Sequence, residues 1–128
     1  MDDMHGLRVW DSARGLTAEL VAIAQRNRRR DQAGILKQLC RAANSIGANL
    51  TESCGAATPR ERLQFLRFAH RSAWETRHHV RASYDCGFMN AKTYRPLAAR
   101  AAIVVRMISS LIATLERAEA KRAKESAA

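Results

Sequence analysis

A stripe of basic side chains that includes one tryptophan lies on one face of a predicted helix over residues 59–86. At about 100° per residue the members fall close to one helical meridian. They are Arg60, Arg67, Arg71, Trp74, His78 and Arg81, and Arg77 completes the set. Arginine neutralises phosphates, and an indole ring stacks on an unpaired base. The pattern therefore predicts a nucleic-acid-binding face.

Two further groups of arginines extend this candidate surface. Arg95 and Arg106 share one face of the following helical segment, and Arg28, Arg29 and Arg30 form a basic joint earlier in the chain. Plainer interpretations stay open: a solvated helix face, a soluble turn at the joint, and burial of Trp74 between subunits. The stripe nevertheless holds few acidic residues, whereas ordinary solvated faces mix both signs of charge.

The charge balance of the chain favours a polyanionic partner. Lys and Arg number 22 against 12 Asp and Glu, which gives a net charge of +10, and 18 of the basic residues are Arg. Arg is the side chain best suited to bidentate phosphate contacts. We therefore expect RNA or DNA as the partner.

Four periodic apolar segments must position these side chains. The composition is 47% hydrophobic with only six Gly and two Pro, too few turn residues for an all-β protein. We expect one all-α domain, residues 1–120, folded as an antiparallel up-and-down four-helix bundle. The expected helices are 5–27, 32–54, 59–86 and 93–118, and residues 119–128 are expected to form a charged, disordered tail.

Helix ends are predicted from capping residues. Asp31 is the expected N-cap of the second helix, and Gly55 follows its end. Thr58, Pro59 and Glu61 have the spacing of a capping box at the start of the third helix, and Gly87 follows its end. Thr93 is the expected N-cap of the fourth helix, with Pro96 in its first turn.

The predicted core leaves apolar surface unused. The expected core face of the third helix holds Phe65, Ala69, Ser72, Thr76 and Ser83. Additional apolar residues lie beside the core rows of the first and fourth helices, namely Leu7, Trp10, Val21, Tyr94, Val105 and Ile112. These favour self-association, although a wider core within the monomer would use them equally well.

Other classes of site and location find little support. No apolar run approaches the roughly 18 residues of a membrane span, and the N-terminus lacks a signal-peptide pattern, so a cytoplasmic protein is expected. The three cysteines form no CxxC pair, and no metal or cofactor motif occurs. We expect no metal, no cofactor and no membrane association.

Several motifs resemble those of the four-helix-bundle proteins encoded by intervening sequences in bacterial 23S rRNA genes. They are Leu7-x-Val9-Trp10, then Arg41-Ala42-x-x-Ser45-Ile46-x-x-Asn49-Leu50-x-Glu52, then Phe65-Leu66-x-x-Ala69-x-x-Ser72-x-x-Glu75, and Gly87-Phe88. The chain departs from the family pattern at Ser53 and Arg71, where glycine is common.

This family is related to the accessory variability determinant of diversity-generating retroelements. That relationship implies a homopentameric barrel that binds nucleic acid and a reverse transcriptase. The resemblance leaves two roles open: a retroelement accessory factor, or an intervening-sequence protein that is purely structural.

A catalytic interpretation rests on Arg71 and His78. Their R-x6-H spacing resembles that of HEPN-type RNases, in which His acts as acid or base and Arg stabilises developing charge. The spacing is common in an Arg-rich helix, so we expect a protein that is not an enzyme. The polar row Arg41, Ser45, Asn49 and Glu52 is expected to be structural, with its members bonded to one another or to a neighbouring helix.

Overall fold

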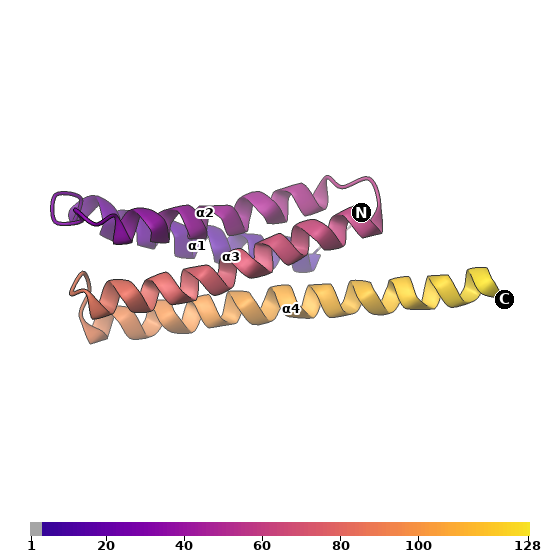
Figure 1. Ribbon diagram of the computed structural model, residues 1–128. Helices are drawn as coiled ribbons and strands as arrows, with labels where there is room; N and C mark the ends of the chain where they lie inside the picture. The colour runs from indigo at the N-terminus through magenta and orange to yellow at the C-terminus, as the bar shows by residue number, and fades with distance from the viewer. Residues whose placement is uncertain (1–3) are drawn as a thin grey trace.

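The computed structural model describes the backbone of residues 4–128 and the side chains from Arg8 onward. Its four helices are α1 (Met4–Arg26), α2 (Ile35–Cys54), α3 (Pro59–Asp85) and α4 (Ala91–Ala127), and residues 4–128 contain no strand. The connections 27–34 and 86–90 lie at one end of the molecule, and the connection 55–58 lies at the other (Figure 1). The described chain is thus an all-helical four-helix bundle.

Each helix packs against two others, so the four close a ring. α1 contacts α2 and α4, and α3 contacts α2 and α4. The contact between α1 and α4 includes an ion pair in which Arg100 Nη1 lies 2.6 Å from Glu19 Oε2. Gly15 leaves room for this crossing, because a Cβ there would lie 3.2 Å from Arg100 Nη2.

One spacing rule accounts for the core of all four helices. Buried residues recur at alternating intervals of three and four, the spacing of side chains that face a neighbouring helix at a shallow crossing angle. They are Val9, Ala13, Leu16, Leu20 and Ile23 in α1, and Leu36, Leu39, Ala43, Ile46, Leu50 and Ser53 in α2. The rows continue with Leu66, Ala69, Ala73, Thr76, Val80 and Ser83 in α3, and Leu97, Ala101, Val104 and Ile108 in α4.

The core face of α3 differs from the expected one. Phe65 is only half-buried, and it packs edge-to-face on Phe68 with ring centroids 6.3 Å apart. Leu63 and Ala73 are buried although neither was expected in the core. The three-four row is centred on Leu66 and Ala73, which leaves the two phenylalanine rings on its flank.

Small hydroxyl residues inside the bundle satisfy their own hydrogen bonds. Thr76 Oγ1 donates to the carbonyl of Ser72 at 2.8 Å, and Ser83 Oγ donates to that of His79 at 2.7 Å. Ser53 Oγ donates to the Leu50 carbonyl at 2.6 Å. These bonds to the preceding turn let polar residues occupy core positions without leaving a buried donor unpaired.

The start of α3 follows the capping prediction, whereas the start of α2 departs from it. Thr58 Oγ1 accepts from the Glu61 amide at 3.1 Å, which confirms it as the N-cap of α3. The second helix, however, begins at Ile35 rather than 32, with Gly34 as its N-cap at a φ of 77°. Asp31 still caps it from outside, because its Oδ2 accepts from the Leu36 and Lys37 amides at 3.1 Å each.

The fourth helix is longer than expected at both ends. Asn90, not Thr93, is its N-cap and accepts from the Thr93 amide at 2.9 Å, so Pro96 lies in the second turn rather than the first. The helix continues to Ala127 instead of ending near 118. Its last turns project beyond the ends of the other helices (Figure 1), with exposed side chains.

The apolar stretch of α4 is longer than expected from the sequence. Within the described residues α4 is long and apolar enough to cross a bilayer by those two criteria, and only 28% of the apolar stretch is buried. In the structure this helix packs against α1 and α3. Much of the apolar stretch of α4 is therefore exposed on the surface of the bundle.

Candidate nucleic-acid interface

All twelve predicted site residues are exposed on the surface. Those of α3 are Arg60, Arg67, Arg71, Trp74, Arg77, His78 and Arg81, those of α4 are Arg95 and Arg106, and those of the first connection are Arg28, Arg29 and Arg30. Trp74 is 51% exposed, unusually high for a tryptophan. The guanidinium groups thus face solvent, as a phosphate-binding surface requires.

Four of the twelve residues surround one hollow between α3 and α4, which we call the α3–α4 hollow. It has a volume of about 440 Å³ and is lined by Trp74, Arg77, His78, Arg81, Tyr94 and Ala98. The α3 members lie three, four and seven positions apart, which places them on one helix face. Tyr94 and Ala98 supply the opposite wall from α4. The hollow combines cations with two aromatic rings.

Trp74 and Arg77 line this hollow and contact each other. The Arg77 Cζ atom lies 4.7 Å from the centroid of the Trp74 ring, the distance of a cation–π contact. His70 meets the same indole edge-on, with centroids 6.5 Å apart and planes at 90°. Trp74 therefore has a fixed orientation while half of its surface remains open to solvent.

Arg81 and Tyr94 also line the hollow, and both contact the ring of Tyr84. Arg81 Cζ lies 5.6 Å from the Tyr84 ring and 5.7 Å from the Tyr94 ring, and those two rings stack with centroids 4.5 Å apart. Its Nε donates to Asp85 Oδ1 at 3.0 Å. Interactions with the Tyr94 hydroxyl and then with the Asp85 carboxylate raise the pKa of Arg81. The guanidinium is fully charged at any physiological pH.

Two arginines of the stripe have acidic partners, which corrects the expectation of unpaired charges. Arg81 pairs with Asp85, and Arg67 Nη2 lies 2.7 Å from Glu116 Oε2 on α4. Both pairs are more than half exposed. Exposed pairs contribute about 0–1 kcal/mol, so a phosphate can displace either carboxylate at small cost.

The remaining predicted residues lie apart from the hollow. Arg60 begins α3 at the far end of the bundle, and Arg71 packs over Phe68 at 5.8 Å. Arg95 and Arg106 lie on α4, outside the lining. The structure therefore gathers part of the stripe into one site and leaves the rest as a distributed positive surface.

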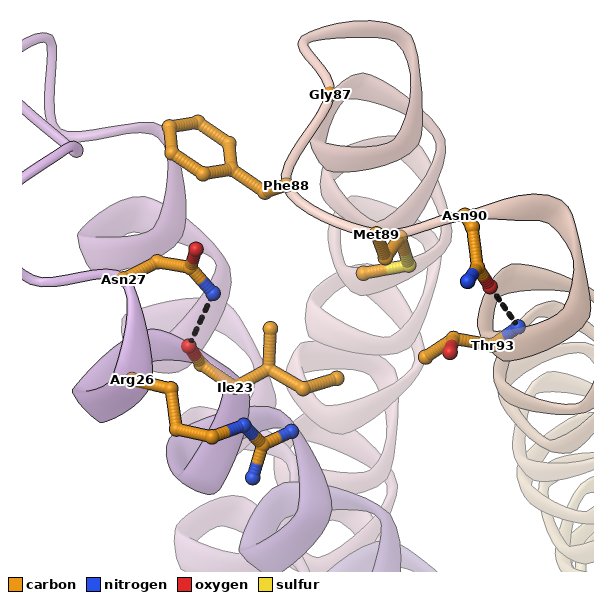
Figure 2. A pocket seen from close by; sticks show the side chains of 8 residues that line it. All are labelled: Ile23, Arg26, Asn27, Gly87, Phe88, Met89, Asn90 and Thr93. Carbon is orange, nitrogen blue, oxygen red and sulfur yellow. Dashed lines mark hydrogen bonds between the residues drawn. The ribbon is translucent and has the colours of Figure 1, made fainter.

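The basic connection Arg28–Arg30 reaches the joint between α3 and α4 through one contact. Arg30 Cζ lies 5.6 Å from the Phe88 ring, and Arg30 Nη1 donates to Asn27 Oδ1 at 3.0 Å. Figure 2 shows Phe88 extending from the α3–α4 joint toward the end of α1, beside a hollow of about 360 Å³. Asn27 and Asn90 border that hollow, but their side chains bond to the Ile23 carbonyl and the Thr93 amide.

The contribution of Tyr84 and Tyr94 to the site was not predicted from the sequence. Tyr94 was expected in an apolar row beside the core, and Tyr84 was not among the predicted site residues. The available signal was the match in spacing: Tyr84 follows Arg77 and Arg81 by seven and three positions, so it shares their side of α3. Tyr94 could be placed only once the packing of α4 on α3 was known.

The other titratable groups do not form a reactive cluster in the described part of the chain. His78 and His79 meet edge-to-face at 5.1 Å, and partial burial, then His78, lower the pKa of His79. Burial and Asp31 raise the pKa of the Cys40 thiol, and neither Cys40 nor Cys86 is in a disulfide bond. No group of three or more His, Cys, Asp or Glu within the described residues could hold a metal ion.

Comparison with known proteins places the chain in a family. The model of a family described as 23S rRNA-intervening sequence protein matches residues 5–110. The chain belongs to this family. Among solved structures, the chain is similar to a protein of unknown function from the S23 ribosomal protein family of Bacteroides thetaiotaomicron VPI-5482. The TM-score is 0.78 at 20% identity, over 85% of this chain and 98% of that chain, so this likeness shows the fold. No curated protein matches the chain.

Two members of the predicted polar row, Ser45 and Asn49, make hydrogen bonds within the bundle. Ser45 Oγ and Ser72 Oγ are 2.8 Å apart across the α2–α3 contact, and Asn49 Nδ2 donates to Ser45 Oγ at 3.1 Å and to the Ser45 carbonyl at 2.9 Å. These bonds confirm the prediction for Ser45 and Asn49. Arg41 and Glu52 lie at the exposed edge of the same row.

Proposed function

We propose that this member of the 23S rRNA-intervening sequence family is a non-enzymatic basic scaffold that binds RNA or DNA through phosphates. The observation that carries the proposal is the outward array of arginines on α3 and α4, in a chain of net charge +10. From Arg60 to Arg106 ten Lys or Arg accompany three acids. Such one-signed charge lowers stability unless a polyanion compensates it.

The surface is built for phosphate contact without base reading. Its polar groups are almost all guanidinium, and the amide side chains of Asn27, Asn49 and Asn90 are engaged in the fold. Base-specific recognition commonly adds Asn or Gln amides directed at adenine edges to the contacts made by arginine. Affinity should therefore depend on salt far more than on sequence.

The direct test is a salt titration. Fluorescence anisotropy of labelled RNA and DNA oligonucleotides should show binding at low salt and a linear fall of log K with log salt concentration. Absence of binding to either nucleic acid at low salt would refute the proposal and leave a purely structural role for the protein.

We further propose that the antiparallel bundle assembles as a homopentamer. The support is unused apolar surface: Ile103 is 44% exposed, and Leu111, Ile112 and Leu115 of α4 are only partly buried. Trp10 and Val21 of α1 are also partly covered, whereas the side chain of Leu7 lies outside the described residues. Light scattering tests this point, since a particle of 14.3 kDa would contradict it.

A cytoplasmic role beside a reverse transcriptase in a diversity-generating retroelement remains part of the proposal and rests on the sequence resemblance. Copurification with the reverse transcriptase from the same locus would support it. A gene inside an rRNA intervening sequence, with no reverse transcriptase nearby, would favour the structural alternative.

The RNase alternative depends on Arg71 and His78. In the structure Arg71 packs over Phe68 and His78 packs against His79, and the two residues lie two helical turns apart. Cleavage of labelled RNA by the native protein, lost in both Arg71→Ala and His78→Ala, would overturn the non-enzymatic proposal. Intact RNA after prolonged incubation is the expected result.

A further inference from the structure

An alternation of arginines and aromatic rings follows the last turns of α3. Arg77 lies over Trp74, Arg81 lies over Tyr84 and Tyr94, and Arg30 lies over Phe88. From Trp74 to Asp85 the helix rises about 16 Å at roughly 1.5 Å per residue. The line is therefore long enough for several linked nucleotides rather than a single small ion.

The guanidinium groups and the indole ring of this line bind different parts of a ligand. Guanidinium groups bind phosphates, and an exposed indole binds a flat apolar face. A base-paired duplex offers phosphates on its outside but keeps its base faces stacked on one another. A single strand offers both, because its bases can turn out of the stack.

The charges in the hollow favour a ligand that is rich in hydrogen-bond acceptors. Arg77, His78 and Arg81 line the hollow, and the Asp85 carboxylate is bonded to Arg81. The wall residues Tyr94 and Ala98 leave the Trp74 side open. An anionic ligand with planar groups matches this combination of charge and exposed ring.

We propose that the α3–α4 hollow is a binding site for single-stranded nucleic acid, in which an unpaired base stacks on Trp74 while Arg77 and Arg81 contact the flanking phosphates. The strand then follows the line of rings toward Phe88 and Arg30. This inference rests on the proposed phosphate-binding function and deepens it. The surface prefers a single strand to a duplex, and Trp74 is the residue that distinguishes the two.

The structure provides a matched control on the diagonally placed helix. Trp10 and Arg14 of α1 repeat the ring–guanidinium pair, with Arg14 Cζ 5.0 Å from the Trp10 ring. Their hollow is walled by α2 residues such as Asn44 and Gly47, and Arg14 is the only arginine that lines it in the described structure. A general effect of removing a surface arginine–tryptophan contact should therefore appear in Arg14→Gln as well.

The test compares an unstructured single-stranded RNA with an RNA duplex of equal length at one low salt concentration. Trp74→Ala should weaken single-strand binding by about fivefold to one hundredfold, the effect of losing one base–aromatic stack. Duplex binding should change less than twofold, and Trp74→Tyr should retain most single-strand affinity. Arg14→Gln should leave the preference for the single strand unchanged.

A second readout does not depend on the stability of the alanine variant. The chain has two tryptophans, so Trp10→Phe leaves Trp74 as the sole indole. Single-stranded RNA should quench its fluorescence in proportion to binding, and duplex RNA should not. Quenching absent despite measured binding would overturn the stacking proposal.

The outcomes separate this inference from the function it rests on. Failure of the native protein to bind either RNA refutes both proposals. Equal binding of single strand and duplex, unaffected by Trp74→Ala, refutes the single-strand site and leaves phosphate binding standing. Loss of the assembled state in Trp74→Tyr, detected by light scattering, would instead assign Trp74 to a subunit interface and overturn the inference.

Discussion

The Arg77 guanidinium lies 4.7 Å above the ring of Trp74, and both side chains are exposed on α3. This contact joins the two properties that a nucleic-acid surface needs, a positive charge and a stacking plane. It also holds two flexible side chains in one arrangement before any ligand arrives, which reduces the entropy lost on binding.

Removal of the Arg77 charge should reduce phosphate contact by one. In Arg77→Gln the slope of log K against log salt for single-stranded RNA should become shallower by about 0.7, the expected effect of one phosphate contact on a single strand. Arg14→Gln serves as the control, with the slope expected to remain that of the native protein. An unchanged slope in Arg77→Gln would place the phosphate elsewhere.

The Ser45–Ser72 hydrogen bond should contribute measurably to stability. Ser45→Ala removes the partner of the Ser72 hydroxyl and one acceptor of Asn49, and we expect a loss of about 1 kcal/mol in the free energy of unfolding. Urea denaturation measures it, with the exposed Ser109→Ala as control. If the losses in Ser45→Ala and Ser72→Ala sum to the loss in the double variant Ser45→Ala/Ser72→Ala, the bond has no coupling energy.

Asp31, which caps α2 from a position before the N-cap residue, should contribute as much to the free energy of unfolding as a regular N-cap residue. Its Oδ2 accepts two amide bonds at the start of α2, so Asp31→Ala should lower the free energy of unfolding by about 1–2 kcal/mol. Asp31→Asn retains one acceptor oxygen and should lose less. No loss in either variant would show that the geometry at Gly34, rather than the Asp31 side chain, determines where the helix begins.

Stability should fall on mild acidification because of His79. Burial lowers its pKa in the folded state, so just below the ordinary value of about 6.5 the unfolded chain binds more protons than the folded one. The free energy of unfolding should therefore decrease as pH falls from 7 through that window. His79→Gln should flatten this part of the stability–pH curve.

The sequence predicted the bundle because the apolar spacing is the physical cause of the packing. Alternating intervals of three and four residues leave one stripe per helix to bury, and the Thr58 cap and the glycines after α2 and α3 mark ends that local chemistry alone determines. The start of α2 escaped prediction because Asp31 reaches its amides across a turn made by Gly34 at positive φ. A spacing rule cannot represent that geometry.

The candidate site was predictable in part for a similar reason. Residues on one helix face, such as Trp74, His78 and Arg81, keep their relationship in any fold that preserves the helix. Tyr94 comes from a different helix, and its stacking on Tyr84 depends on how α4 packs against α3. The acidic partner of Arg67, Glu116, depends on the same packing.

We propose that the location of the positive charge on the bundle, rather than the total charge, creates the binding surface. Two triple variants of equal net charge test it: Arg77→Gln/Arg95→Gln/Arg106→Gln, and Arg8→Gln/Arg14→Gln/Arg122→Gln, each of which reduces +10 by three to +7. Anisotropy titration of the same single-stranded RNA at one salt concentration is the measurement. We predict a large loss of affinity in the first variant and a much smaller loss in the second, and equal losses in both would contradict the claim.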